Sequence, residues 1–94
     1  MYDRASSELI IDNKDVRIIR WSFKTNQSTG LHKHEYDYVV GPCKTGQLYI
    51  ITENENTISD LVIHEPYHRK KGIEYEVVYN GNSCMEFIEI EIKS

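Results

Sequence analysis

The sequence predicts a small all-β protein, and three observations support this. Short apolar runs recur about every 10 residues, which gives seven or eight strands at the spacing of a β-sandwich or barrel. These runs are rich in β-branched and aromatic residues, which favour strands. No helical period continues far enough to predict a helix longer than a turn. A sheet of this size closes most economically as a small jelly roll, which limits exposed edges, so we expect that architecture.

Turn residues separate the predicted strands along the chain. A polar turn at 12–15 follows the first run, a polar loop at 25–30 follows the second, and Gly41-Pro42 ends the third. An irregular stretch at 64–72 ends in a glycine. The predicted strands are, in order, 9–11, 16–23, 37–40, 47–52, 57–63, 73–79 and 86–93.

The last run alternates cleanly between apolar and charged residues. This period of two predicts a strand with two chemically different faces. The two faces carry Ile88, Ile90 and Ile92 on one side and Glu89, Glu91 and Lys93 on the other.

Composition excludes several classes of function. The net charge of −4 and pI of about 5.5 give no electrostatic footprint for nucleic acid. No apolar run approaches the roughly 20 residues of a membrane span. The first residues lack the basic and then apolar segments of a secretory signal, so we expect a cytoplasmic protein. Its two cysteines, Cys43 and Cys84, are too few for a disulfide framework.

The stretch 29–40 is the most compact candidate site. Residues i and i+2 share one face of a strand and lie about 6.5 Å apart, so His32 and His34 can lean onto one ion. A metal–nitrogen bond is roughly 2.0–2.1 Å. Glu35 reaches that ion only if the chain turns after His34, because its parity on an unbroken strand is wrong. Asp37 shares this parity and is the alternative oxygen ligand.

These residues resemble a known family, the small single-domain cupins. Gly30, His32, His34 and Glu35 follow the order of the first cupin motif, ahead of a strand and Gly41. The second motif is matched in register by His64-Glu65, Lys70-Lys71-Gly72, Ile73-Glu74-Tyr75 and Asn80. The resemblance makes 1–94 a single domain with its core at about 8–92. Arg20-Trp21 and the run from 29 to 40 look like a subgroup of small bacterial cupins associated with β-alanine breakdown.

The resemblance implies a double-stranded β-helix with a divalent metal (Zn, Fe, Mn or Ni) in the barrel mouth, and a homodimer formed through the sheets. The second motif departs from the family pattern because Tyr75 replaces its last histidine. A neutral tyrosine is a poor metal ligand and more often donates a hydrogen bond. His68 is the nearest replacement, and Tyr75 is the candidate catalytic residue.

Further residues are candidates for the pocket wall. Arg20 can form a salt bridge on a strand face or grip a carboxylate ligand. The tyrosines Tyr36, Tyr38 and Tyr75 can place a hydroxyl in the pocket. The basic run 68–71 is either a solvated hairpin tip or a collar that attracts an anion.

Two functions remain open at this point, beside a purely structural dimerisation domain, which would have a pocket filled by side chains. The first is a pocket that binds a divalent metal and a small anionic metabolite, with metal-dependent oxygenase, isomerase or decarboxylase chemistry. The second is a metabolite-binding cupin without catalysis, whose metal site has degraded. The fold alone does not choose between them.

Overall fold

The computed structural model describes residues 2–93, all of whose regular elements are strands. None of these residues forms a helix that is long and apolar enough to cross a membrane. The strands are β1 (Asp3–Arg4), β2 (Ser6–Asp12), β3 (Val16–Lys24), β4 (Gln27–Ser28), β5 (His32–Lys33), β6 (Asp37–Pro42), β7 (Gly46–Ile51), β8 (Asn56–Leu61), β9 (Tyr67–Arg69), β10 (Glu74–Tyr79) and β11 (Cys84–Ile92).

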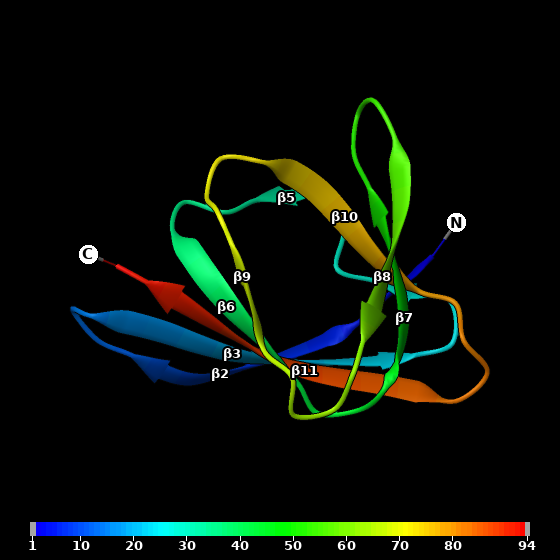
Figure 1. The fold of residues 1–94 in the computed structure, drawn as a ribbon, viewed down its shortest axis with the longest axis horizontal. Coiled ribbons are helices and arrows are strands. Elements are labelled where there is room, and N and C mark those ends of the chain that lie inside the picture. Colours follow the sequence, from blue (N-terminus) through cyan, green and yellow to red (C-terminus); the bar gives the residue numbers. More distant parts are fainter. Residues whose placement is uncertain (1, 94) are drawn as a thin grey trace.

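The strands form two sheets that curl around a common interior (Figure 1). One sheet has the order β1-β4-β10-β7-β8, with β5 paired to β10. The other has the order β2-β3-β11-β6-β9. This is the expected all-β double-stranded β-helix. The predicted long strands are all present, whereas β1, β4, β5 and β9 are short pairings for which the sequence has no clear periodic signal.

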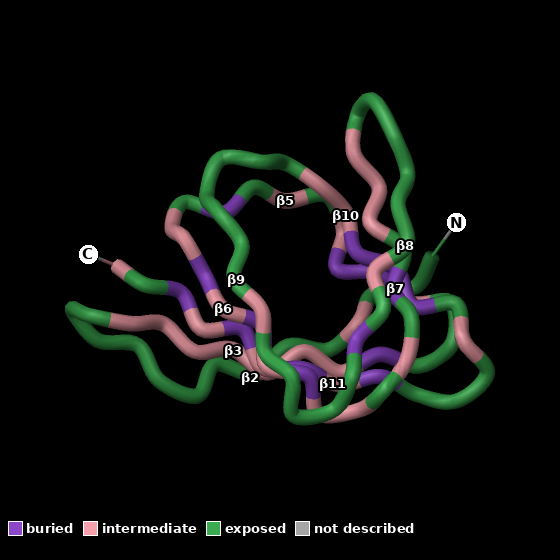
Figure 2. Tube along the Cα trace, in the orientation of Figure 1, coloured by how far each residue is buried: buried purple, intermediate pink, exposed green. Residues whose placement is uncertain are grey.

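The core lies between the two sheets, and buried segments of β6, β7, β10 and β11 line it (Figure 2). Aromatic and aliphatic side chains from both sheets fill it, as expected for inward-facing positions of paired sheets. Its buried cluster consists of Phe23, Tyr38, Val40, Leu48, Leu61, Val77, Tyr79, Met85 and Phe87.

The last strand, β11, has its charged face inside the barrel. It lies between β3 and β6, pairing residue 89 with residue 19 on one side and with residue 40 on the other. Glu89 and Glu91 are buried, with 6% and 2% of their surface exposed, whereas Ile88 and Ile90 are only half-buried. The alternation is therefore as predicted, and the structure adds that two carboxyl groups point into the interior.

Candidate functional site

His32 lies on β5, which pairs with β10 so that His32 is opposite Tyr75. Its Nδ1–H donates to the carbonyl oxygen of Gly30 at 3.0 Å, with Thr29 Oγ1 at 3.3 Å. A carbonyl can only accept, so this bond assigns the proton of neutral His32 to Nδ1 and leaves a lone pair on Nε2. Gly30 has φ +78°, and a Cβ there would lie 2.9 Å from Arg4 Nη1, so glycine is needed to make this turn.

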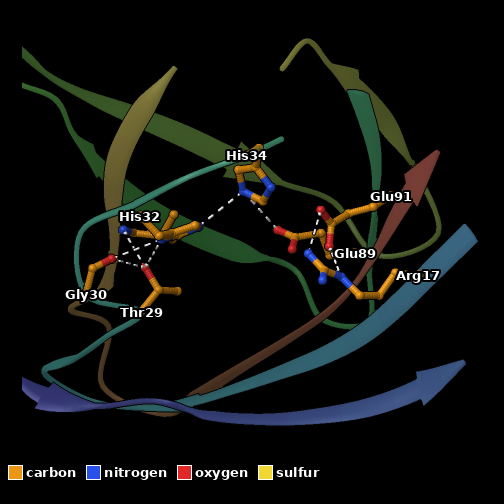
Figure 3. A network of polar contacts seen from close by, with 8 residues as sticks. Arg17, Thr29, Gly30, His32, His34, Glu89 and Glu91 are labelled. Atoms are coloured by element: carbon orange, nitrogen blue, oxygen red, sulfur yellow. Dashed lines mark hydrogen bonds and ion pairs between the residues drawn. The ribbon is translucent and has the colours of Figure 1, made fainter. Parts of the chain in front are cut away.

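His34 occupies the middle of a polar chain (Figure 3). Its Nε2 lies 3.1 Å from Nε2 of His32 and 3.5 Å from Oε1 of Glu89. Because His32 presents a lone pair, the consistent assignment has the His34 Nε2–H donating to it. The contacts run from Gly30 through the two imidazoles to the buried carboxyl group of Glu89, and we call them the polar row. The Nε2–H of His34 is donated to His32, so its approach to Glu89 is a close contact and not a second hydrogen bond.

Stacking and burial fix the His34 ring. It stacks on Tyr38 with ring centroids 3.9 Å apart and planes at 23°. Burial, assisted by the neighbouring His32, lowers the pKa of His34 to about 4. The imidazole is therefore neutral at physiological pH.

Glu89 and Glu91 lie two residues apart on the same strand but differ in their partners. Glu91 accepts bonds from Arg17 Nε and Nη2 at 2.7 and 3.1 Å. Glu89 has only His34 beside it among the ion-pair contacts of residues 2–93. Burial, together with the charge of Glu91, raises the pKa of Glu89 to about 7, although the Trp21 indole N–H and Arg17 act in the opposite direction.

Tyr75 completes the cluster from β10. Its ring centroid lies 5.6 Å from both imidazole centroids. Burial raises the pKa of its phenol well above the usual value, so the hydroxyl stays protonated. Tyr75 is thus available as a hydrogen-bond donor, as the sequence suggested.

A cavity of about 160 Å³ opens beside this cluster. Most of its wall is apolar, and a few polar groups interrupt it, which is the usual make-up of a small-molecule site. The apolar lining is Val40, Leu48, Ile50, Ile73, Val77 and Phe87, and the polar lining is Tyr38, Thr52, Tyr67, Arg69, Tyr75 and Glu89.

Several predicted oxygen and nitrogen ligands lie elsewhere. Glu35 is exposed, and Asp37 accepts a bond from the backbone N–H of Lys71 at 2.9 Å. His68 is exposed on β9. It lies between Tyr67 and Arg69, which line the cavity, so its side chain points to the other face of the strand. Glu35 and His68 therefore face solvent, and Asp37 is engaged by the backbone of Lys71.

Two predicted pocket residues are also outside the cavity. Arg20 forms ion pairs with Glu8 at 3.1 Å and Glu86 at 3.4 Å, as expected for a salt bridge on a strand face. Tyr36 borders a separate recess next to Asp37. Of the four predicted wall residues, Tyr38 and Tyr75 do line the cavity.

The side chains do not fit the metal that the resemblance implies. Within residues 2–93, no three His, Cys, Asp or Glu side chains are grouped so that they could hold one ion. A catalytic zinc site keeps three protein ligands around the metal.

Glu89 is the functional residue that sequence reasoning missed. The alternating charges of the last strand resemble a solvated face, which directs attention away from the site. A signal was nevertheless present, because Met85 and Phe87 have the same parity as Glu89 and Glu91 and are strongly apolar. Their burial carries the two glutamates into the barrel.

Comparison with known proteins identifies the family. No family model matches the chain. The chain is 36% identical over 83 residues to the β-alanine degradation protein BauB of Pseudomonas aeruginosa, covering 88% of this chain and 87% of BauB. A crystal structure of a cupin domain from Bordetella pertussis superposes with a TM-score of 0.96 at 35% identity, covering 100% of this chain and 98% of that one. The chain belongs to the cupins.

A more distant cupin has the same fold. A cupin superfamily protein of Desulfitobacterium hafniense superposes with a TM-score of 0.73 at 15% identity, covering 100% of this chain and 82% of the other. The sequence-based assignment of fold and family is therefore confirmed. The homodimer stays a prediction, because the structure is that of a single cupin chain.

Proposed function

We propose that this cupin binds a small metabolite in its barrel and acts in the breakdown of β-alanine or a related β-amino acid. The observation that carries the proposal is the cavity whose lining includes Glu89, in contact with His34, and Tyr75. The similarity to BauB, whose name refers to β-alanine degradation, supports the class of metabolite.

Contacts within the chain already fix the polar row, and this favours a cupin site without a metal ion. His32 is held by Gly30 and His34 by Tyr38, so both rings are fixed beside Glu89, which lines the cavity. Preorganised polar groups in an apolar wall orient a ligand at little entropic cost. The proposal therefore needs no ion to complete the site.

Deleting the gene in its own organism tests the proposed role. We expect slower growth with β-alanine as the only nitrogen source and normal growth with ammonium. Wild-type protein should restore growth. Ile50→Trp, which fills the cavity from its wall, should not restore it, whereas the exposed neighbour Tyr49→Trp should. Unchanged growth on β-alanine after the deletion would refute the role.

A further inference from the structure

The cavity contains a carboxyl group with no cationic side chain to balance it. Within residues 2–93, no lysine or arginine forms an ion pair with Glu89, and its neighbour His34 is neutral. Glu91 shows the contrast, since Arg17 grips both of its oxygens. A buried carboxylate without a cation in contact is costly, because burial removes its hydration and no neighbouring positive charge compensates for that loss. Glu89 is therefore suited to receive a positive charge from outside the chain.

The opposite charge lies on another wall of the same cavity. Arg69 lines the cavity from β9, and no carboxylate in the described part of the chain forms an ion pair with it. Its guanidinium carbon lies 4.4 Å from the centre of the Tyr67 ring, which holds the group against the wall. β6 separates β9 from β11, and the register offsets Arg69 from Glu89 by two residues, so their backbones lie roughly 12 Å apart.

The wall between these two charges is aromatic. Tyr38, Tyr67, Tyr75 and Phe87 contribute rings to the cavity. Aromatic faces attract ammonium groups through their quadrupole, more strongly when water is excluded. The rings thus favour a cation next to Glu89.

We propose that the cavity binds an amino acid whose amine and carboxylate are separated by two or more carbons, with its ammonium on Glu89 and its carboxylate on Arg69. This inference rests on the proposed function and specifies its ligand class. An α-amino acid carries both charges on one carbon, so its two charges span a shorter distance than those of β-alanine. The apolar wall contacts the methylene groups in between.

Isothermal titration at pH 8 with β-alanine, glycine, propionate and propylamine tests the inference. We expect β-alanine to bind at least tenfold more tightly than the other three probes. Glu89→Gln should weaken β-alanine binding at least tenfold and leave propionate within twofold. Arg69→Gln should weaken both β-alanine and propionate and leave propylamine within twofold.

Matched controls exclude a general effect of charge. Glu86→Gln makes the same change on the outer face of β11, and Lys70→Gln removes a neighbouring cation outside the cavity lining. Both should bind β-alanine like the wild type.

Propionate binding as tightly as β-alanine would overturn the inference. If Ile50→Trp then also lost propionate binding, the cavity would still be a ligand site. Failure of all four probes would also overturn the ligand class, while the growth experiment decides the proposed function separately.

Discussion

Tyr38 and His34 stack almost face to face, with ring centroids 3.9 Å apart, although the chain between them passes through an irregular turn. Tyr38 is 2% exposed and belongs to the core, so the imidazole rests on a rigid surface. The stack therefore couples the packing of β6 to the direction in which His34 presents its Nε2 to Glu89.

Removing the tyrosine ring should affect stability and site together. Tyr38→Ala deletes a buried aromatic side chain and should cost about 3–5 kcal/mol in the free energy of unfolding, measured by urea denaturation. Tyr38→Phe keeps the stacked ring and should retain most of that energy. A Tyr38→Ala protein as stable as the wild type would show that the core does not depend on this ring.

Stability should respond to pH through two opposing groups. Glu89 has its pKa raised from 4.5 to about 7 by burial, so its contribution is fully present below pH 4.5 and is lost as pH rises through 7. His34 has its pKa lowered from 6.5 to about 4, so its contribution is present above pH 6.5 and is lost as pH falls through 4. Each contribution is about 3 kcal/mol. Between pH 4.5 and 6.5 one falls while the other rises, so the free energy of unfolding of the wild type should change little with pH in this range.

Single variants should separate these two contributions. In Glu89→Gln the His34 contribution remains, so the free energy of unfolding should rise from pH 4 to 6.5. In His34→Phe the Glu89 contribution remains, so it should fall from pH 4.5 to 7. Chemical denaturation across this pH range measures both slopes. Identical pH profiles in the wild type and both variants would contradict the assigned shifts.

The Arg17–Glu91 pair should be costly to break from one side. Arg17→Met leaves the carboxylate of Glu91, which is 2% exposed, without its cation. Breaking a buried pair in this way costs about 3–5 kcal/mol. The double variant Arg17→Met/Glu91→Leu should recover most of the loss, because it leaves no buried charge unpaired. Denaturant midpoints of the three variants check this, and no recovery in the double variant would contradict it.

Metal analysis distinguishes the polar row from a metal centre. Protein purified without a histidine tag should contain much less than one metal ion per chain. Its melting temperature should not respond to Zn²⁺, Mn²⁺ or Fe²⁺, because the chain does not group three ligands. Near-stoichiometric metal that disappears in both His32→Ala and His34→Ala would contradict this expectation.

The fold and about half of the residues that form the site could be predicted from the sequence. Strand spacing, turn residues and the His-x-His pattern lead to the correct barrel, because these signals are local in the chain. Glu35, Asp37 and His68 were predicted as ligands by their closeness in sequence, and the path of the backbone separates them from the imidazoles. Glu89 reaches His34 from 55 residues further along the chain, through strand pairing alone. Such a contact depends on which face of β11 turns inward and on which strand lies opposite. The apolar Met85 and Phe87 indicate the inward face, whereas the partner strand follows only from the folded barrel.

The position of β11 also has a consequence for biosynthesis. This strand supplies Glu89 to the cavity and closes the sheet by pairing with both β3 and β6. Residues 84–92 must leave the ribosome before β3 and β6 can form their hydrogen bonds with β11. Pairings between such distant segments form slowly, so the nascent chain presents unpaired edges until then. The wall of the cavity in this cupin is therefore complete only after β11 has paired with β3 and β6.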